Sequence, residues 1–325
     1  MAATLSQPSN SDMSQPGAHY LGVDLGGTKT EVAVLDGSHR FLLRERLPTP
    51  KHSYTDILAT IAHLVSLARQ RCQLAADHPV GIGIPGCVDP ASQQVRGANT
   101  NALNGQTLLK DLQDTLACPV FVENDANCLA LSEAVDGASR GSRLAFAAIL
   151  GTGCGAGITL GTHIWTGRNA LAGEWGHNPL PWPTALELEA PACWCGQRGC
   201  IETWVSGPGL AADHLRQTHQ SMTPEQIVQA MMQGDRHASQ TWQRYVGRLA
   251  RSLAHIVNTL DPDVIVLGGG MSTIEPLYTD LVSRMEEHTF TRPIATPVHP
   301  AMHGDSSGVR GAAWLTGKAL KQGIG

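Results

Sequence analysis

A glycine-rich turn that carries a hydroxyl group and a positive charge, residues 26–29 (Gly-Gly-Thr-Lys), separates two apolar segments near the start of the chain. Consecutive backbone N–H groups in such a turn form a concavity that suits phosphate oxygens. The turn lies between two expected strands, whereas a P-loop needs G-x-x-x-x-G-K-[ST] at the start of a helix, so a P-loop is excluded. Asp24, at the tip of the first strand, is placed to hold Mg²⁺ through water. An ordinary hairpin with a surface lysine is the alternative interpretation.

A second glycine-rich segment, residues 151–157, reads Gly-Thr-Gly-Cys-Gly-Ala-Gly. It matches the dinucleotide fingerprint G-x-G-x-x-A, but that fingerprint requires a following helix and an acidic residue about 20 positions later. Residues 158–160 have the pattern of a strand instead, which argues against a nicotinamide cofactor. We therefore expect a second phosphate-binding hairpin that faces the first. Gly268 to Gly270 follow another expected strand, where a flat nucleoside could lie against bare backbone.

Polar residues 123–127, Glu-Asn-Asp-Ala-Asn, follow a short buried strand and precede a helical stretch. Asp125 can be a helix cap at this position. It can also be a general base, because a positioned carboxylate that accepts the proton of a sugar hydroxyl is worth roughly 10²–10⁴-fold in rate. Phosphoryl transfer otherwise depends on in-line placement and on charge stabilisation at the γ-phosphate. An aspartate opposite two phosphate loops fits this division of labour.

Four potential metal ligands are closely spaced in the sequence: His177, Cys193, Cys195 and Cys200. Three thiolates and an imidazole make a Cys₃His set, the composition of a closed structural zinc site. Disulfides are the competing account, but the first two cysteines are too close to pair comfortably and one thiol would be left over. We therefore expect Zn²⁺ in a loop of residues 177–202. The metal would direct the carboxylates of Glu174 and Glu202 towards a sugar pocket.

The composition favours a soluble globular protein of two lobes. The chain has 325 residues, of which 42% are hydrophobic, and its 23 basic and 28 acidic residues give a net charge of −5. No basic patch dominates, which argues against duplex nucleic-acid binding. The longest clean apolar run, residues 144–150, is far shorter than the ~20 residues of a membrane span. Residues 1–17 lack the charged start and apolar core of a signal peptide, so we expect a disordered leader and a reducing, cytoplasmic location.

The elements that would position these residues alternate between hairpins and β/α units. Expected strands span residues 20–25, 30–35, 41–47, 80–85, 120–122, 144–150, 158–160 and 264–267. Expected helices span residues 54–74, a stretch from 127 to 137, and a face at 249–260. Strand, glycine turn and strand occur twice, around Gly26 and Gly153, which indicates a weak architectural repeat. The pattern predicts two α/β lobes with ligand loops at the strand ends.

These segments together resemble the ROK family (repressors, open reading frames, kinases) from Tyr20 to about Leu315. The resemblance is carried by residues 24–29, 83–86, 123–127, 151–155, 173–177, the cysteine cluster and residues 268–270. The longer blocks at 124–137 and 303–314 look like the bacterial fructokinase/mannokinase branch. Repressor members of the family carry an N-terminal helix-turn-helix, and the ~17 residues before the first strand are too few to hold one.

The resemblance implies the α/β actin-like (RNase H-like) sugar-kinase ATPase fold, with a nucleotide and sugar cleft between two α/β lobes. Residues 18–124 would form a small lobe, and residues 125–325 a large lobe that carries the zinc loop. A C-terminal helix at about 308–320 would pack back on the small lobe. The implied activity is ATP-dependent phosphorylation of a hexose 6-hydroxyl, with fructose or mannose as first expectation. A glucose or N-acetylglucosamine kinase and a non-catalytic sugar sensor are the alternatives, and a homodimer is expected.

The resemblance also implies roles for individual residues. Asp125 would be the catalytic base, and His177 would bind zinc with one ring nitrogen and a sugar hydroxyl with the other. The implied sugar ligands are Asn99, Asn124, Asp125, Glu174, His177 and Glu202. The implied ATP contacts, with Asp24 also holding Mg²⁺, are Asp24, Gly26, Gly27, Thr28, Lys29, Gly151, Thr152, Gly153, Cys154, Gly155, Gly268 and Gly269. The implied cofactors are therefore ATP, Mg²⁺ and a structural Zn²⁺.

Overall fold

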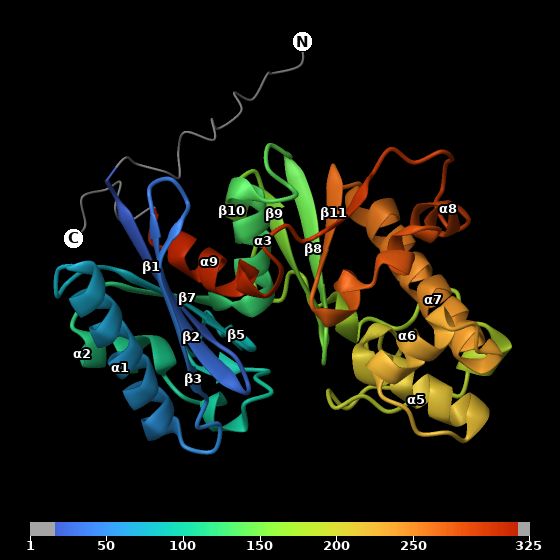
Figure 1. Cartoon of the computed structure of the whole chain (residues 1–325), viewed down its shortest axis with the longest axis horizontal. Helices are drawn as coiled ribbons and strands as arrows, with labels where there is room; N and C mark the ends of the chain where they lie inside the picture. The colour runs from blue at the N-terminus through green and yellow to red at the C-terminus, as the bar shows by residue number, and fades with distance from the viewer. Residues whose placement is uncertain (1–16, 318–325) are drawn as a thin grey trace, which may run out of the picture.

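Two five-stranded sheets organise the computed structural model, which describes residues 17–317 (Figure 1). The strands of the first sheet are β1 (His19–Leu25), β2 (Lys29–Asp36), β3 (Phe41–Pro48), β4 (Val80–Ile84) and β7 (Val120–Asn124). Their order is β3-β2-β1-β4-β7, in which an antiparallel meander is extended by two parallel strands. Residues 1–16 of the expected leader and residues 318–325 at the end of the chain lie outside the described residues.

The second sheet repeats the strand arrangement of the first. Its strands are β8 (Leu144–Leu150), β9 (Cys154–Leu160), β10 (His163–Ile164), β11 (Val264–Gly268) and β12 (Val298–Pro300). The order β10-β9-β8-β11-β12 again joins an antiparallel meander to two parallel strands. A short hairpin of β5 (Cys87–Val88) and β6 (Val95–Arg96) stands apart. The shared strand order confirms the α/β class and the architectural repeat that the glycine turns indicated.

Side-chain alternation along the strands decides which helices cover which face. In β1, Leu21 and Val23 point to an apolar core shared with α1 (Tyr54–Cys72) and α2 (Leu108–Leu116). Tyr20 points the other way, into a cluster with Trp314 of α9 (Ser307–Trp314). Because successive side chains of a strand point to opposite faces, Asp24 faces the same side as Tyr20. The strand period thus directs this carboxylate towards the interior of the molecule.

The second sheet is covered in the same way. Ala145 and Ala147 of β8 pack against α3 (Asp125–Asp136), while Phe146 of the same strand joins the larger core under α7 (Arg236–Leu260). The remaining helices of this half are α4 (Glu202–Val205), α5 (Gly207–Thr218), α6 (Pro224–Met232) and α8 (Leu281–Glu286). Figure 1 shows α3 and α9 between the two sheets, so these two helices form the layer that joins the halves.

Close backbone contacts hold this central layer together. Gly22 of β1 and Gly81 of β4 are register partners that both face α9. A Cβ on Gly22 would lie 2.3 Å from Ala313 N, and a Cβ on Gly81 would lie 1.8 Å from Ala312 O. A Cβ on Gly311 of α9 would likewise lie 1.7 Å from the carbonyl oxygen of Cys128 in α3. Glycine is therefore required at these positions, because any side chain would push α9 away from the sheet and from α3.

Several helices begin at polar residues that satisfy free backbone N–H groups, among them α1, α5 and α7. Ser53 accepts a hydrogen bond from Asp56 N (3.3 Å) at α1, and Asp235 accepts one from Ala238 N (2.7 Å) at α7. Ser206 accepts one from Gly209 N (3.1 Å) at α5. The cap at Asp235 explains why α7 begins at Arg236, well before the apolar face at 249–260 from which this helix was expected.

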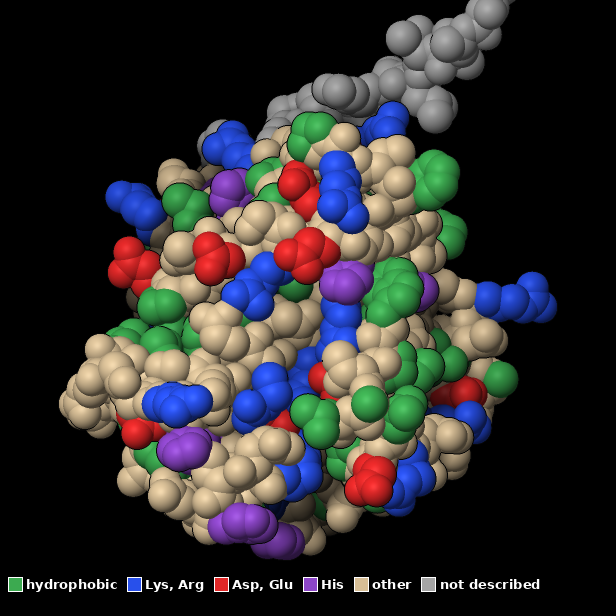
Figure 2. Space-filling model, turned by 90° about the vertical axis from the view of Figure 1, so that its right-hand side faces the viewer, with side chains coloured by type: hydrophobic (Ala, Val, Ile, Leu, Met, Phe, Trp, Pro, Cys, Tyr) green, Lys and Arg blue, Asp and Glu red, His purple; other side chains and the backbone are tan. Residues whose placement is uncertain are grey.

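Buried ion pairs attach the loop of residues 177–202 to α7. Glu187 has a side chain 5% exposed and accepts hydrogen bonds from Arg248 Nε (2.7 Å) and from Arg251 Nη2 on both oxygens (2.9 Å each). Arg248 also lies over the ring of Trp204, 4.4 Å from its centroid. Figure 2 shows the side of the molecule on which α7 lies in Figure 1, with basic side chains down its middle and acidic side chains among them. Within residues 17–317, no helix is long and apolar enough to cross a membrane.

Replacing Glu187 with alanine should destabilise the fold strongly. Arg251 would keep its buried charge without a carboxylate, whereas Arg248 would still pair with Asp213 at 3.0 Å. Leaving the one buried charge unpaired costs about 3–5 kcal/mol of the free energy of unfolding. Urea denaturation followed by circular dichroism would measure the loss, with Glu189→Ala at a nearby exposed position as the control. Equal stability of the two variants would contradict the anchoring role of Glu187.

Candidate functional site

A cavity of about 780 Å³ collects the residues that the sequence assigned to sugar binding. All six of them line it: Asn99, Asn124, Asp125, Glu174, His177 and Glu202. Residues 152–155 of the second glycine turn line it as well. The first turn lies at its border, because a Cβ on Gly27 would be 3.8 Å from Asn99 Oδ1. Asp24 and residues 26–29, 151, 268 and 269 are not among the lining residues.

Asn124, and not Asp125, is the cap of α3. Its Oδ1 accepts hydrogen bonds from Ala126 N (2.9 Å) and Asn127 N (3.3 Å), and its Nδ2 donates to the carbonyl of Gly86 (2.9 Å). Asp125 is the first residue of the helix, and its Oδ1 accepts a hydrogen bond from Ala126 N (2.7 Å). The alternative that Asp125 caps the helix is therefore wrong, because the preceding residue is the cap. The Asp125 side chain lines the cavity instead.

The carboxylates of Asp24 and Asp125 are both buried, and both are costly to ionise. Burial raises the pKa of Asp125 to about 6, and the charge of Glu174 adds to the rise. Burial also raises the pKa of Asp24 to about 7, and the negative charge of Asp125 adds to that rise. Burial and a neighbouring negative charge favour protonation of Asp24, or a nearby cation, over a free charge on its carboxylate.

The surroundings of Asp24 suit a hydrated divalent cation. Among residues 17–317 its carboxylate makes no hydrogen bond or ion pair, and Gly308 of α9 packs against it so closely that a Cβ there would lie 2.6 Å from Oδ2. Mg²⁺ prefers carboxylate and water oxygens and keeps several of its waters in phosphate sites. A buried carboxylate with a raised pKa and no ion-pair partner among the described residues therefore fits this ion.

The first glycine turn is closed by its own backbone. Gly26 N donates to Lys29 O (2.9 Å), and the Thr49 hydroxyl donates to Gly26 O (2.7 Å). Thr28 and Lys29 are exposed, and Lys29 Nζ lies 3.6 Å from Asp305 Oδ2. The turn thus presents a hydroxyl and an ammonium group whose partner is a solvent-exposed carboxylate, and a phosphate could compete for that ammonium group.

The second glycine turn is shorter than the sequence suggested and is tied to Glu202. Strand β9 begins at Cys154, whose side chain is buried, so the turn comprises residues 151–153. Cys154 N donates to Glu202 Oε2 (2.8 Å), and a Cβ on Gly153 would lie 2.8 Å from the same oxygen. Gly207 N, at the start of α5, donates to Gly151 O (2.9 Å). This turn therefore offers backbone atoms in a fixed position.

Gly268 and Gly269 have packing reasons of their own. A Cβ on Gly268, at the end of β11, would lie 2.3 Å from Leu129 Cδ1. Gly269 has a φ of 83° and a Cβ there would lie 2.5 Å from Leu150 O, whereas nothing lies within 4 Å of a Cβ on Gly270. The first of these glycines is buried against α3, so a nucleoside could reach bare backbone at Gly269 and Gly270 but not at Gly268.

The four predicted metal ligands converge. The ligand atoms of His177, Cys193, Cys195 and Cys200 lie within 4.8 Å of one another. Cys195 Sγ is 3.6 Å from Cys200 Sγ, and Cys193 Sγ is 3.6 Å from His177 Nδ1. A tetrahedral zinc ion with Zn–S bonds of ~2.3 Å places its sulfurs about 3.8 Å apart. The set fits such an ion, and the sulfur separation is too long for the disulfide alternative.

The cavity contains residues that sequence reasoning did not select. Trp194, between two of the cysteines, lines it and donates from Nε1 to Glu202 Oε1 (2.7 Å). Leu171, with Ala170 and Ala172, supplies an apolar part of the wall. Trp194 could have been noted from its place inside the C-x-C pattern. The apolar segment carries no signal of its own, since its position depends on Gly173, where a Cβ would lie 1.9 Å from Ala156 O.

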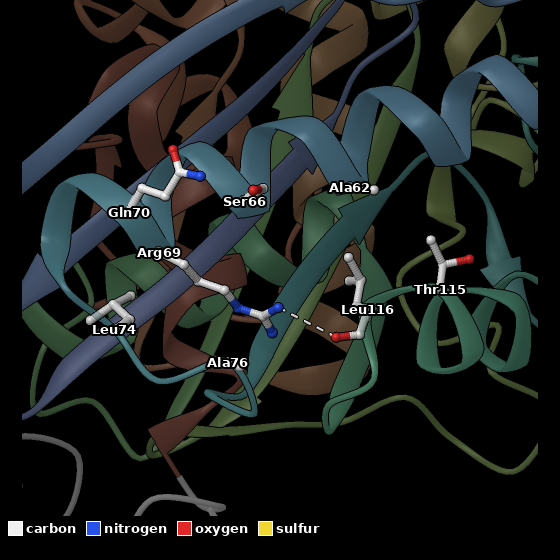
Figure 3. A pocket seen from close by; sticks show the side chains of 8 residues that line it. All are labelled: Ala62, Ser66, Arg69, Gln70, Leu74, Ala76, Thr115 and Leu116. Atoms are coloured by element: carbon white, nitrogen blue, oxygen red, sulfur yellow. Dashed lines mark hydrogen bonds between the residues drawn. The ribbon is translucent and has the colours of Figure 1, made fainter.

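A second hollow lies between α1 and α2, the two helices that cover one face of the first sheet. Its volume is about 430 Å³, and Figure 3 shows Arg69 reaching across it to donate to Leu116 O (3.3 Å). Its lining includes Ala62, Ser66, Gln70 and Thr115, and none of the predicted site residues belongs to it. We therefore assign the functional site to the larger cavity.

Comparison with known proteins shows which family the chain belongs to. Residues 20–319 match the model of the ROK family. The chain belongs to the ROK family. It is 39% identical over 300 residues to an N-acetyl-D-glucosamine kinase of Salmonella paratyphi A, covering 91% of this chain and 98% of that protein. It is a sugar kinase, an enzyme that transfers phosphate from ATP to a sugar.

Solved structures of ROK proteins share its fold. The crystal structure of a ROK hexokinase from Thermus thermophilus has a TM-score of 0.82 and 28% identity, covering 94% of this chain and all of that one. A ROK glucokinase from Streptomyces griseus, solved with glucose and AMPPNP, has a TM-score of 0.74 and 28% identity, covering 92% and 99%. The expected actin-like sugar-kinase fold is thereby confirmed, while the lobe boundaries at 124/125 stay a prediction.

In this ROK-family protein, replacing Asp24 with asparagine should stabilise the metal-free fold at pH 8. The folded-state pKa of Asp24 is raised, so the folded state holds a proton that the unfolded state releases, and stability falls as pH rises from about 4 to about 7. Removing the charge should recover on the order of 2–4 kcal/mol at pH 8 and little near pH 4. Urea denaturation at both pH values would measure this, with the exposed Asp77→Asn as control.

Replacing Cys195 with serine should remove about one metal ion per chain. The variant leaves three ligands of the Cys₃His set, and structural zinc sites of this kind are closed by four. Elemental analysis of the purified protein gives the metal content, and Cys72→Ser, outside the cluster, is the matched control. A metal-to-protein ratio equal to that of the control would show that the cluster does not hold a metal.

Proposed function

We propose that this protein transfers the γ-phosphate of ATP to the 6-hydroxyl of N-acetylglucosamine. The observation that carries the proposal is the 39% identity, over nearly the whole of both chains, to proteins named N-acetyl-D-glucosamine kinase. An Escherichia coli protein of the same name is 38% identical. Fructose, which the sequence resemblance placed first, is less well supported, and the N-acetylglucosamine alternative takes its place.

The cavity has the polar groups that a hexose needs. Asn99, Asn124, Glu174, His177 and Glu202 offer amide, carboxylate and imidazole atoms around one space. His177 Nδ1 faces the thiol of Cys193, which leaves Nε2 for a sugar hydroxyl. Carboxylates that accept hydrogen bonds from neighbouring hydroxyls give orientation as well as affinity, because each bond to a charged acceptor is directional and strong.

An acetamido group requires an apolar surface beside those polar atoms. Ala170, Leu171 and Ala172 supply one in the wall of the same cavity, and Leu171 is 57% exposed. A methyl group placed there would bury part of the Leu171 side chain and gain the corresponding hydrophobic free energy. Hexoses without the acetyl group would leave this surface in water, so the wall favours the N-acetylated sugar.

Asp125 is the proposed general base. A pKa of about 6 leaves its carboxylate ionised at neutral pH and close to the value at which it can also hold a proton. In this role Asp125 accepts the proton of the 6-hydroxyl as the oxygen forms a bond to the γ-phosphorus and the bond to the ADP oxygen breaks. The raised pKa predicts that activity falls as pH drops below about 6.

The nucleotide would lie along the two glycine turns. Backbone N–H groups of residues 27–28 and 152–153, with Lys29, would face the phosphates, because those of Gly26 and Gly151 close the turns themselves. The nucleoside would lie near Gly269 and Gly270. Asp24 would hold Mg²⁺ through water, and the ion would neutralise charge between the phosphates. The Cys₃His set would hold a structural Zn²⁺ that fixes the loop of residues 177–202. A homodimer, as expected from the resemblance, also stays a proposal.

A coupled assay of ADP release with N-acetylglucosamine, glucose, mannose and fructose tests the substrate. We expect the highest kcat/KM for N-acetylglucosamine, by about tenfold or more over glucose, because the acetyl group adds an apolar contact and an amide hydrogen bond. Asp125→Asn is the control for chemistry, and it should lose about 10²–10⁴-fold in kcat while still binding the sugar.

Two outcomes would contradict the proposal. A higher kcat/KM for fructose or mannose would return the substrate to the first expectation. Turnover of Asp125→Asn within about tenfold of the parent enzyme would show that another group, or water, accepts the proton. Sugar binding by the variant can be measured by calorimetry, which separates a lost base from a lost pocket.

A further inference from the structure

Trp194 occupies an unusual position between two metal-ligand cysteines. Its side chain is 65% exposed, so burial contributes little to holding it in place. Two contacts fix its orientation instead. Nε1 donates to Glu202 Oε1 at 2.7 Å, and the ring meets His177 edge-on with centroids 5.0 Å apart and planes at 86°. Both partners line the sugar cavity, as Trp194 itself does.

The backbone on either side of Trp194 is held by its own hydrogen bonds. Cys193 N donates to Gln197 O (2.8 Å), and Gly196 N donates to Cys193 O (3.1 Å). These bonds make a tight turn that presents the indole from a fixed Cα. Trp has two side-chain torsions, so a ring anchored in this way loses little further freedom when it holds a partner.

Glu202 is held at both oxygens by protein donors. Oε2 accepts from Cys154 N at 2.8 Å, and Oε1 accepts from the indole of Trp194 at 2.7 Å. The first donor fixes one end of the carboxylate against the second glycine turn. The second donor fixes the rotation of the carboxylate plane, which decides where the remaining lone pairs point. Without the indole N–H, the plane could turn about the Oε2 contact.

We propose that Trp194 is a positioning residue that sets the orientation of the Glu202 carboxylate towards the sugar. The inference rests on the proposed role of Glu202 as a sugar ligand. Trp194 donates a hydrogen bond from its indole N–H to Glu202, and Glu202 in turn accepts a hydrogen bond from a sugar hydroxyl. The bound sugar then shields the Trp194–Glu202 hydrogen bond from water. The role concerns sugar binding, so it predicts an effect on the KM for the sugar and not on phosphoryl transfer itself.

Paired substitutions separate the hydrogen bond from the bulk of the ring. Trp194→Phe keeps an aromatic ring beside His177 and removes the donor, whereas Trp194→Gln restores an N–H at similar reach from Cβ and removes the ring. We expect Trp194→Phe to raise the KM for the sugar about tenfold, with kcat and the KM for ATP changed less than about twofold. Trp194→Gln should recover most of that loss.

Metal content and direct binding complete the test. Elemental analysis should give the same metal-to-protein ratio for both variants and the parent, and calorimetry should show the same weakening of sugar binding as the KM. A parent-like KM for Trp194→Phe would overturn the inference. Equal losses in both variants would attribute the effect to the ring, and loss of metal would attribute it to the loop, so either result would also overturn it.

Glu202→Gln distinguishes this inference from the proposed function. The assay uses whichever sugar the parent enzyme phosphorylates best, so it does not depend on the identity of that sugar. If Glu202→Gln leaves the KM for the sugar unchanged, the role of Glu202 as a sugar ligand fails, and the inference fails with it. If Glu202→Gln raises the KM and Trp194→Phe does not, the inference about Trp194 fails alone.

Discussion

The burial of two carboxylates is the constraint on which the site depends. Asp24 faces inwards from β1, Asp125 begins α3, and the charge of Asp125 adds to the cost of ionising Asp24. Folding alone would not favour this arrangement, because both groups lose hydration and neither gains an ion pair within residues 17–317. In the proposed function a bound cation would offset these charges, so that binding would relieve a cost that the fold imposes.

The second constraint is the convergence of distant segments on one carboxylate. Glu202 follows directly on the cysteine cluster, yet it fixes the glycine turn that precedes β9, and α5 holds the same turn from the other side. The loop of residues 177–202 is in turn fastened to α7 through Glu187. A rigid path thus runs from the arginines of α7 to the backbone that faces the cavity. The proposed sugar-binding and phosphate-binding parts of the site share this support.

Local pattern predicted the elements and the chemistry, and long-range packing decided the details. Three features could be recognised because each depends on residues near one another in sequence: the strand alternation, the two glycine turns and the Cys₃His spacing. The cap moved from Asp125 to Asn124 because the amide also reaches Gly86, 38 residues away. The burial of Gly268 depends on Leu129, and the bond from Cys154 to Glu202 spans 48 residues. No pattern in a single sequence reports such contacts.

The return of α9 to the first sheet has a consequence for how the protein is made. A ribosome synthesises β1 and β4 long before Ser307–Trp314, yet the glycines of these strands pack against that helix. Until α9 leaves the exit tunnel, one face of the first sheet has no cover, and its apolar surface is open to chaperones. Completion of the early half therefore depends on the synthesis of Ser307–Trp314, and a nascent chain stalled before this helix would carry an unfinished sheet.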